Sequence, residues 1–208
     1  MKTSIIREAG FEEALLGLSL SYNSDYDGAY DGAYDVAKRL AFKGDGHNKF
    51  LESIAVWIDI DVPREFWQQF DTYRVGVTKQ SESTMHTICK RPLTQDDFEH
   101  HVLAPYMRHL NELIRRGNWE KVKHDLPESF LQRRIVCTNY MALQRIIRQR
   151  YNHKLTEWRM FCDDVLGQCE YPEFLETPEL KAENPVNDSD LIEQFNRNFD
   201  MPKEQDDS

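Results

Sequence analysis

The chain has 208 residues, of which 40% are hydrophobic, so one packed domain with a sizeable core is expected. Its formal net charge of −10 argues against binding of long nucleic acid. No apolar run approaches the roughly 18 residues of a membrane-spanning helix. The four cysteines form no Cys-x-x-Cys pair and no secretory signal precedes them, which favours free thiols in the reducing cytoplasm.

Charge is unevenly distributed along the chain. Residues 177–208 hold nine acidic and three basic residues, a net of −6, together with frequent proline and asparagine. This composition predicts a disordered acidic tail, in which residues 191–199 are interpreted as a transient helix or a docking segment. The preceding residues 1–176 are assigned to one domain. Residues 108–159 within it are rich in arginine and lysine, which suits a small anionic ligand.

The domain is expected to begin with a strand over residues 3–6 and a helix over Phe11–Leu20, where apolar residues recur at helical spacing. A tandem tyrosine repeat of period four follows, at Tyr26, Tyr30 and Tyr34. It is interpreted either as a mobile flap over a site or as a helix whose tyrosine stripe packs on the core. Gly44 and Gly46 are expected to end this helix after Lys43.

The clearest strand signal lies in the following segment. Apolar side chains occupy every second position, at Ile54, Val56, Ile58, Ile60 and Val62. This period of two predicts a half-buried strand. Pro63 suits the first turn of a helix over residues 64–73. Residues 74–86 are then expected to form a polar loop, which either binds a polar ligand or is a solvated connection.

The second half of the chain is predicted to be mainly helical. Thr94 is expected to cap a helix that starts near Gln95, breaks or restarts at Pro105 and stops at Gly117. The remaining predicted elements are a short helix, a short strand and two longer helices, at residues 127–133, 135–138, 139–150 and 154–169.

The motifs of common enzyme classes are missing from the sequence. There is no nucleophile elbow, no P-loop and no Gly-x-Gly-x-x-Gly. His100, His101 and His109 follow no metal-binding pattern such as His-Glu-x-x-His, so no metal site is predicted. If the protein is an enzyme, its reactive centre is expected to be a cofactor. Arginine, lysine and hydroxyl side chains would then bind the phosphate of a nucleotide.

Over residues 47–175 the order of motifs resembles the flavin-dependent thymidylate synthase family, ThyX. Family members carry Gly-His-x-x-x-(Leu/Phe)-Glu-His before a strand. The matching residues here are Gly46, His47, Leu51 and Glu52. Ser53 stands in place of the last histidine.

The family signature Arg-His-Arg-x-x-Ser-x-Asn-Glu-x-Ser-x-Arg fits the chain in two registers. In one, Arg74 is the third residue of the triplet, Gln69 falls on a family glutamine, and two extra residues precede Glu82. In the other, Arg74 is the first residue and there is no insertion. The signature asparagine is missing, Thr84 takes the place of the serine, and His86 takes the place of the final arginine.

The C-terminal part of the resemblance keeps the family spacing. A Leu-Pro pair is followed by an asparagine that opens a helix ending in arginine. The residues concerned are Leu126, Pro127, Asn139, Leu143 and Arg150. Lys123 lies where the family has an arginine upstream of the Leu-Pro pair.

The resemblance implies an α+β fold, an antiparallel β-sheet flanked by helices, in a homotetramer with sites at subunit interfaces. It implies reductive methylation of dUMP to dTMP, with methylenetetrahydrofolate and NADPH as co-substrates and FAD as the hydride carrier. The implied nucleotide-binding residues are Gln69, Glu82, Ser83, Thr84, His86, Lys123 and Arg150, of which Arg150 is also the catalytic residue. The implied flavin-binding residues are His47, Arg74, Asn139 and Arg145.

Two other hypotheses share this scaffold. One is a pyrimidine-nucleotide methylase or hydroxymethylase with an altered substrate or cofactor. The other, from a different class, is a non-catalytic protein that binds a nucleotide or RNA.

Overall fold

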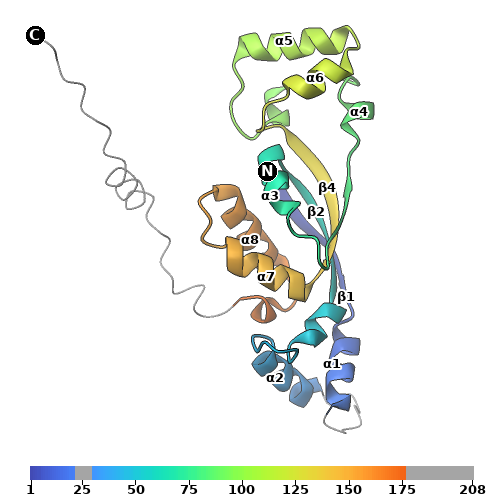
Figure 1. The fold of residues 1–208 in the computed structure, drawn as a ribbon, viewed down its shortest axis with the longest axis vertical. Coiled ribbons are helices and arrows are strands. Elements are labelled where there is room, and N and C mark those ends of the chain that lie inside the picture. The colour runs from blue at the N-terminus through green and yellow to red at the C-terminus, as the bar shows by residue number, and fades with distance from the viewer. Residues whose placement is uncertain (22–29, 177–208) are drawn as a thin grey trace, which may run out of the picture. The chain divides into compact units, whose positions relative to one another are not determined.

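In the computed structural model, residues 1–21 and 30–176 are described, and they belong to a compact unit, Met1–Thr177. The acidic tail, the segment 191–199 and Tyr26 lie outside the described residues. The unit is organised around a four-stranded antiparallel sheet in the order β1-β2-β4-β3 (Figure 1). Its strands are β1 (Lys2–Ala9), β2 (Ala55–Pro63), β3 (Thr78–Ser81) and β4 (Leu131–Asn139).

The period-two pattern of the sequence sets the orientation of the central strand. Val56, Ile58 and Ile60 are fully buried, whereas the alternate residues are half-buried. Because successive side chains of a strand point to opposite faces, one face of the sheet becomes the apolar core. In the β2–β4 register Ile58 lies opposite Val136, which is also fully buried.

Three helices contact the strands and one another: α3 (Arg64–Phe70), α7 (Tyr140–Arg150) and α8 (Thr156–Gln168). Their aromatic side chains interlock between α3 and α8. The ring centroids of Phe66 and Trp158 are 4.1 Å apart, and the rings of Phe70 and Trp158 are nearly parallel at 5.9 Å. Each such side chain buries roughly 150–250 Å², so this cluster is a major source of stability.

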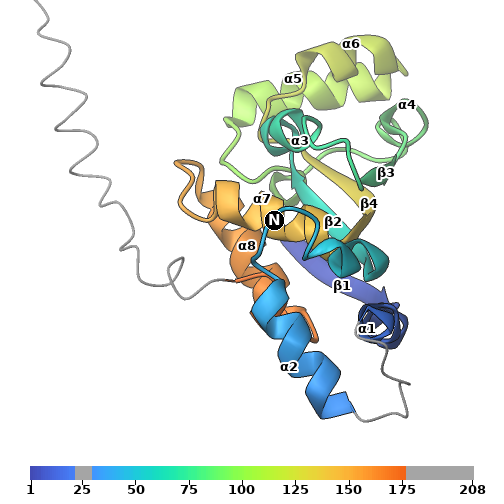
Figure 2. The same cartoon turned by 60° about the horizontal axis from the view of Figure 1, so that its bottom comes forward.

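Further helices lie at the two ends of the sheet (Figures 1 and 2). One end carries α1 (Phe11–Leu20), α2 (Tyr30–Leu40) and the short helix η1 (Lys49–Ser53). The other carries α4 (Thr84–Thr87), the one-turn helix η2 (Gln95–Asp97), α5 (Ala104–Arg115) and α6 (Trp119–Asp125). The latter group has its own hydrophobic cluster, which includes Leu110, Ile114 and Val122. The last element of the described residues is the short helix η3 (Pro172–Phe174).

Within residues 1–21 and 30–176, no helix combines the length and the apolar character needed to cross a membrane.

Most of the predicted elements are confirmed. The first strand and the helix over Phe11–Leu20 are present, and Asn139 caps α7, its side chain accepting a hydrogen bond from the Ala142 N–H. Pro105 lies in the first turn of α5, and Gly117 follows that helix with a φ of +69°. The helix expected to reach Lys43 ends earlier, at Leu40.

Two predictions are wrong. Residues 127–133 are not a helix, because the chain from Leu131 onward pairs with β2 and becomes the first part of β4. The carbonyl groups of Glu128 and Phe130 accept hydrogen bonds from the Arg64 N–H. In a helix they would instead accept from N–H groups of the next turn. Residues 74–86 are not merely a loop, since they contain β3 and the first three residues of α4.

Two further differences concern short helices. The segment capped by Thr94 has a capping box with Asp97 but forms a single 3-10 turn. Helix α6 was not predicted, although its cap residue Asn118, which accepts a hydrogen bond from the Lys121 N–H, is a recognisable start signal.

The tyrosine repeat can be described at its last member. Tyr34 packs edge-on against Phe11 and Phe174, with ring centroids 6.3 and 5.6 Å apart. For Tyr34, this packing agrees with the interpretation that the tyrosines of the repeat pack on the core.

Candidate functional site

Arg150, the last residue of α7, lies where α3, α7 and α8 meet. Its Nε donates a hydrogen bond to the Tyr73 hydroxyl at 2.8 Å, and its Nη1 donates to the Gln69 Oε1 at 3.1 Å. The guanidinium carbon lies 4.8 Å from the centroid of the Trp158 ring. These contacts hold the guanidinium group in one orientation, and we call Arg150 with Gln69, Tyr73 and Trp158 the Arg150 cradle.

The partners of Arg150 are themselves fixed. Trp158 is fully buried and Tyr73 is 6% exposed. The Trp158 Nε1 donates to the same Gln69 Oε1 at 2.9 Å, and the Tyr73 hydroxyl donates to the Gln149 Oε1 at 3.0 Å. Arginine has five N–H donors, and the bonds to Tyr73 and Gln69 use only two of them. The cradle therefore presents a half-buried, permanently charged group with donors left for an anion.

His153 lies beside the cradle. Its Nδ1 accepts a hydrogen bond from the Leu155 N–H at 3.1 Å, and its ring centroid is 6.3 Å from that of Trp158. Burial, with the positive charges of Arg150 and Lys154, lowers the pKa of His153 below its ordinary value of 6.5. At neutral pH His153 is therefore uncharged, and it adds no second cation to the cradle.

The depressed pKa of His153 predicts a loss of stability in weak acid. Between the folded-state pKa and 6.5 the unfolded chain binds more protons than the folded chain, so the free energy of unfolding falls as pH decreases through this window. Above pH 6.5, the stability that comes from the neutral His153 is fully present. His153→Gln should flatten this dependence in urea titrations from pH ~7.5 to ~5. The exposed His101, replaced in the same way, is the control. Equal slopes in the parent and His153→Gln would contradict the assignment.

Three of the residues implied for flavin binding lie on one loop or next to it. The Arg145 Nη2 donates to the Val75 carbonyl at 3.1 Å. The next residue, Gly76, has a φ of +71°, and a Cβ there would lie 3.1 Å from the Asn139 Nδ2. Arg74 precedes them on the same loop and is exposed, as is Arg145. Arg74 thus lies on this loop, and Asn139 and Arg145 lie against it. Their role in flavin binding stays a prediction.

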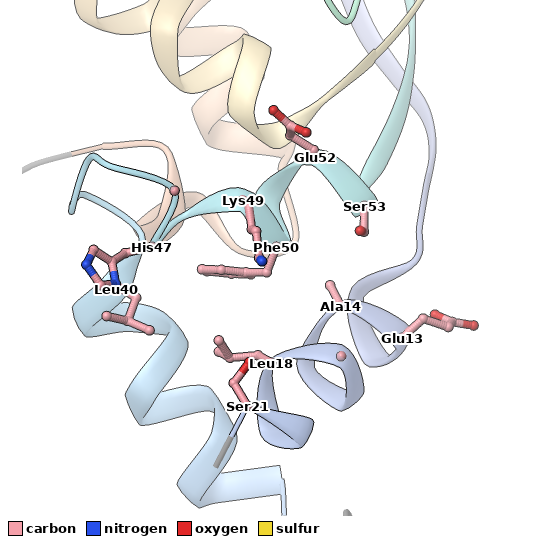
Figure 3. Close-up of a pocket in the computed structure, with 12 residues that line it drawn as sticks. Glu13, Ala14, Leu18, Ser21, Leu40, His47, Lys49, Phe50, Glu52 and Ser53 are labelled. Atoms are coloured by element: carbon pink, nitrogen blue, oxygen red, sulfur yellow. The ribbon is translucent and has the colours of Figure 1, made fainter. Parts of the chain in front are cut away.

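His47 lies elsewhere, in a cleft of about 520 Å³ between α1, α2 and η1 (Figure 3). Apolar side chains such as Leu18, Leu40 and Phe50 line it together with Lys49. No hydrogen bond or ion pair within the described residues joins His47 to Arg74, Asn139 or Arg145.

The other residues implied for nucleotide binding form a second surface. Glu82, Ser83 and His86 are exposed and Thr84 is half-buried, all at the β3–α4 junction. Glu82 also lines a cleft with Asp61 and Arg133. Helix α4 packs against α6, which carries the exposed Lys123. No hydrogen bond or ion pair in the described part of the chain joins these residues to Arg150, whereas Gln69 contacts it directly.

Tyr73 and Trp158 were not predicted as site residues. Tyr73 directly precedes Arg74 in the signature region, and this position is only a weak indication that Tyr73 belongs to a site. Trp158 follows Arg150 by eight positions, across the turn between α7 and α8, so no helical periodicity relates the two.

The sequence matches no protein-family model and no curated protein. Its fold is similar to two solved structures of the flavin-dependent thymidylate synthase ThyX from Helicobacter pylori, each with FAD and dUMP. The first has a TM-score of 0.70 at 17% identity and covers 85% of this chain and 98% of that chain. The second has a TM-score of 0.72 at 15% identity and covers 86% and 99%. The predicted fold class, an antiparallel sheet flanked by helices as in ThyX, is confirmed.

Proposed function

We propose that the chain binds dUMP, or a related pyrimidine nucleotide, with the phosphate on Arg150. We further propose that it converts dUMP to dTMP as a ThyX-like enzyme. The observation that carries this proposal is the orientation of the Arg150 guanidinium by Gln69, Tyr73 and Trp158. A preoriented guanidinium binds a phosphate through two parallel hydrogen bonds at a low cost in side-chain entropy. The solved structures of similar fold contain dUMP, which supports the choice of ligand.

Within the described residues, no hydrogen bond or ion pair joins the Arg150 cradle to the other residues implied for nucleotide binding, which supports a site shared between subunits. Gln69 and Arg150 form one surface, while the β3–α4 junction and Lys123 form another. In a homotetramer, one subunit would supply the cradle and a second would supply Glu82, Ser83, Thr84, His86 and Lys123. Because a symmetric assembly repeats the same contact, each copy of the cradle would then be completed by a neighbouring copy of the chain.

The residues present fit an anionic cofactor such as FAD. Arg74 and Arg145 are exposed guanidinium groups at one loop, and Asn139 lies against the same loop. They would hold the phosphates of FAD. FAD, when bound, supplies the hydride that completes the methyl group, and NADPH and methylenetetrahydrofolate are the co-substrates. The chain's own part is to bind and orient the nucleotide.

The test combines a binding measurement with an activity measurement. Full-length protein mixed with FAD should retain, after gel filtration, a flavin absorbance band near ~450 nm. With dUMP, methylenetetrahydrofolate and NADPH added, it should form dTMP. Replacing both Arg74 and Arg145 with alanine should reduce flavin retention, while Arg148→Ala, another exposed arginine of α7, should not. Tight dUMP binding without a flavin band would favour the non-catalytic nucleotide-binding alternative.

A further inference from the structure

Three side chains from distant parts of the sequence converge outside the Arg150 cradle. They are Glu65 in the first turn of α3, Glu157 in the first turn of α8, and His100 on the connection before α5. One potential ligand atom from each lies within 4.8 Å of those of the other two. An imidazole and two carboxylates are a donor set that binds divalent transition metals in proteins.

The distance between His100 and Glu157 is compatible with a shared metal ion. The His100 Nε2 lies 3.6 Å from the Glu157 Oε1, which is too long for a hydrogen bond. Two ligands at about 2.0–2.2 Å from a tetrahedral metal are separated by about 3.3–3.6 Å. The observed separation therefore fits two atoms bound to one cation.

Glu157 also needs a positive partner. Its side chain is only 8% exposed, and a buried carboxylate is costly unless it is paired or binds a metal. Among the described residues, the partner in an ion pair with Glu157 is His100, whose own side chain is 68% exposed. A cation between them would compensate the buried carboxylate and keep one coordination position open to water.

The ligands are supported by ordered neighbours. The Gln95 side chain donates to the His100 carbonyl at 2.9 Å and accepts from the Val102 N–H at 3.0 Å, which fixes the backbone on both sides of His101. Glu157 directly precedes the fully buried Trp158. A metal site needs such support because its ligands must be held close to their final geometry.

We propose that Glu65, His100 and Glu157 bind a divalent transition-metal cation, with Zn²⁺ the best match to one imidazole nitrogen, two carboxylate oxygens and a water. This site would join α3 to α8. Glu65 lies one helical turn before Gln69, and Glu157 is adjacent to Trp158, so the metal would brace two partners of Arg150. The proposal does not depend on the reaction, because a metal that braces the fold is detected without substrate.

The direct test is zinc titration of chelator-treated, full-length protein by calorimetry, followed by thermal unfolding. The parent should bind one Zn²⁺ per chain and unfold a few degrees higher with saturating zinc, since a ligand that binds only the folded state stabilises it. His100→Ala and Glu157→Gln should each weaken zinc binding by at least the roughly 10–100-fold seen on loss of a metal site's outer partners. The neighbouring His101→Ala should bind as the parent does.

Two outcomes would overturn the proposal. One is a parent protein that takes up no stoichiometric zinc although its circular dichroism shows a folded chain. The other is zinc binding that His100→Ala and His101→Ala retain equally, which would place the metal on other side chains. Glu157→Gln preserves side-chain size, so a folded variant with parental zinc affinity would likewise exclude this site.

Discussion

Replacing Arg150 with alanine is expected to weaken dUMP binding by about 1.5–3 kcal/mol, the range for a hydrogen bond to a charged group. The guanidinium group is oriented by Gln69 and Tyr73 before any ligand arrives. Its loss therefore removes a preorganised anion site rather than a flexible surface charge. Calorimetric titration of dUMP into FAD-supplemented protein measures the effect.

Two substitutions serve as controls. Arg150→Lys should recover only part of the affinity, because an ammonium cannot bind the phosphate through two parallel N–H groups. Arg148→Ala should have little effect, since Arg148 is exposed. Because Arg150 also lies over the Trp158 ring, each variant must first be shown to be folded. Equal dUMP affinity in folded Arg150→Ala and in the parent would remove Arg150 from the nucleotide site.

Trp158→Ala is expected to lower the free energy of unfolding by about 3–5 kcal/mol, the range for large aromatic residues in a core. Trp158 is fully buried and its ring contacts Phe66, Phe70 and Phe161, with centroids 4.1 to 5.9 Å away. Alanine leaves a cavity where α3 meets α8. It also removes the hydrogen bond from the indole Nε1 to Gln69. Urea denaturation monitored by circular dichroism measures the loss.

The matched control is Trp119→Ala, because Trp119 is 42% exposed at the start of α6. This replacement should lower the free energy of unfolding far less. Trp158→Phe separates packing from positioning. It keeps most of the apolar volume but lacks the donor to Gln69, so it should be more stable than Trp158→Ala and still bind dUMP more weakly than the parent. Similar losses for Trp158→Ala and Trp119→Ala would contradict the assigned role of the aromatic cluster.

The elements that could be predicted from the sequence are those with strong local periodicity. The alternation in β2 identified its buried face, and the apolar spacing of α7 and α8 located both helices. The α+β class came from motif order in the ThyX resemblance. The family spacing from Asn139, which belongs to the same resemblance, also singled out Arg150.

Long-range pairing explains what could not be predicted. The start of β4 contains polar and charged residues, and it becomes a strand because it pairs with β2 along its length. The cradle depends on contacts across 77 to 89 sequence positions, between Arg150 and Tyr73 and between Trp158 and Gln69. Glu65, His100 and Glu157 are similarly brought together only by tertiary structure, because they come from α3, from the connection before α5 and from α8.

The most direct test of the nucleotide site is a crystal structure of the full-length protein with dUMP and FAD. We predict that the dUMP phosphate lies within hydrogen-bond distance of the Arg150 guanidinium, with Gln69 and Tyr73 still bonded to that side chain. A phosphate bound elsewhere, with the Arg150 cradle unchanged and free of ligand, would contradict the account.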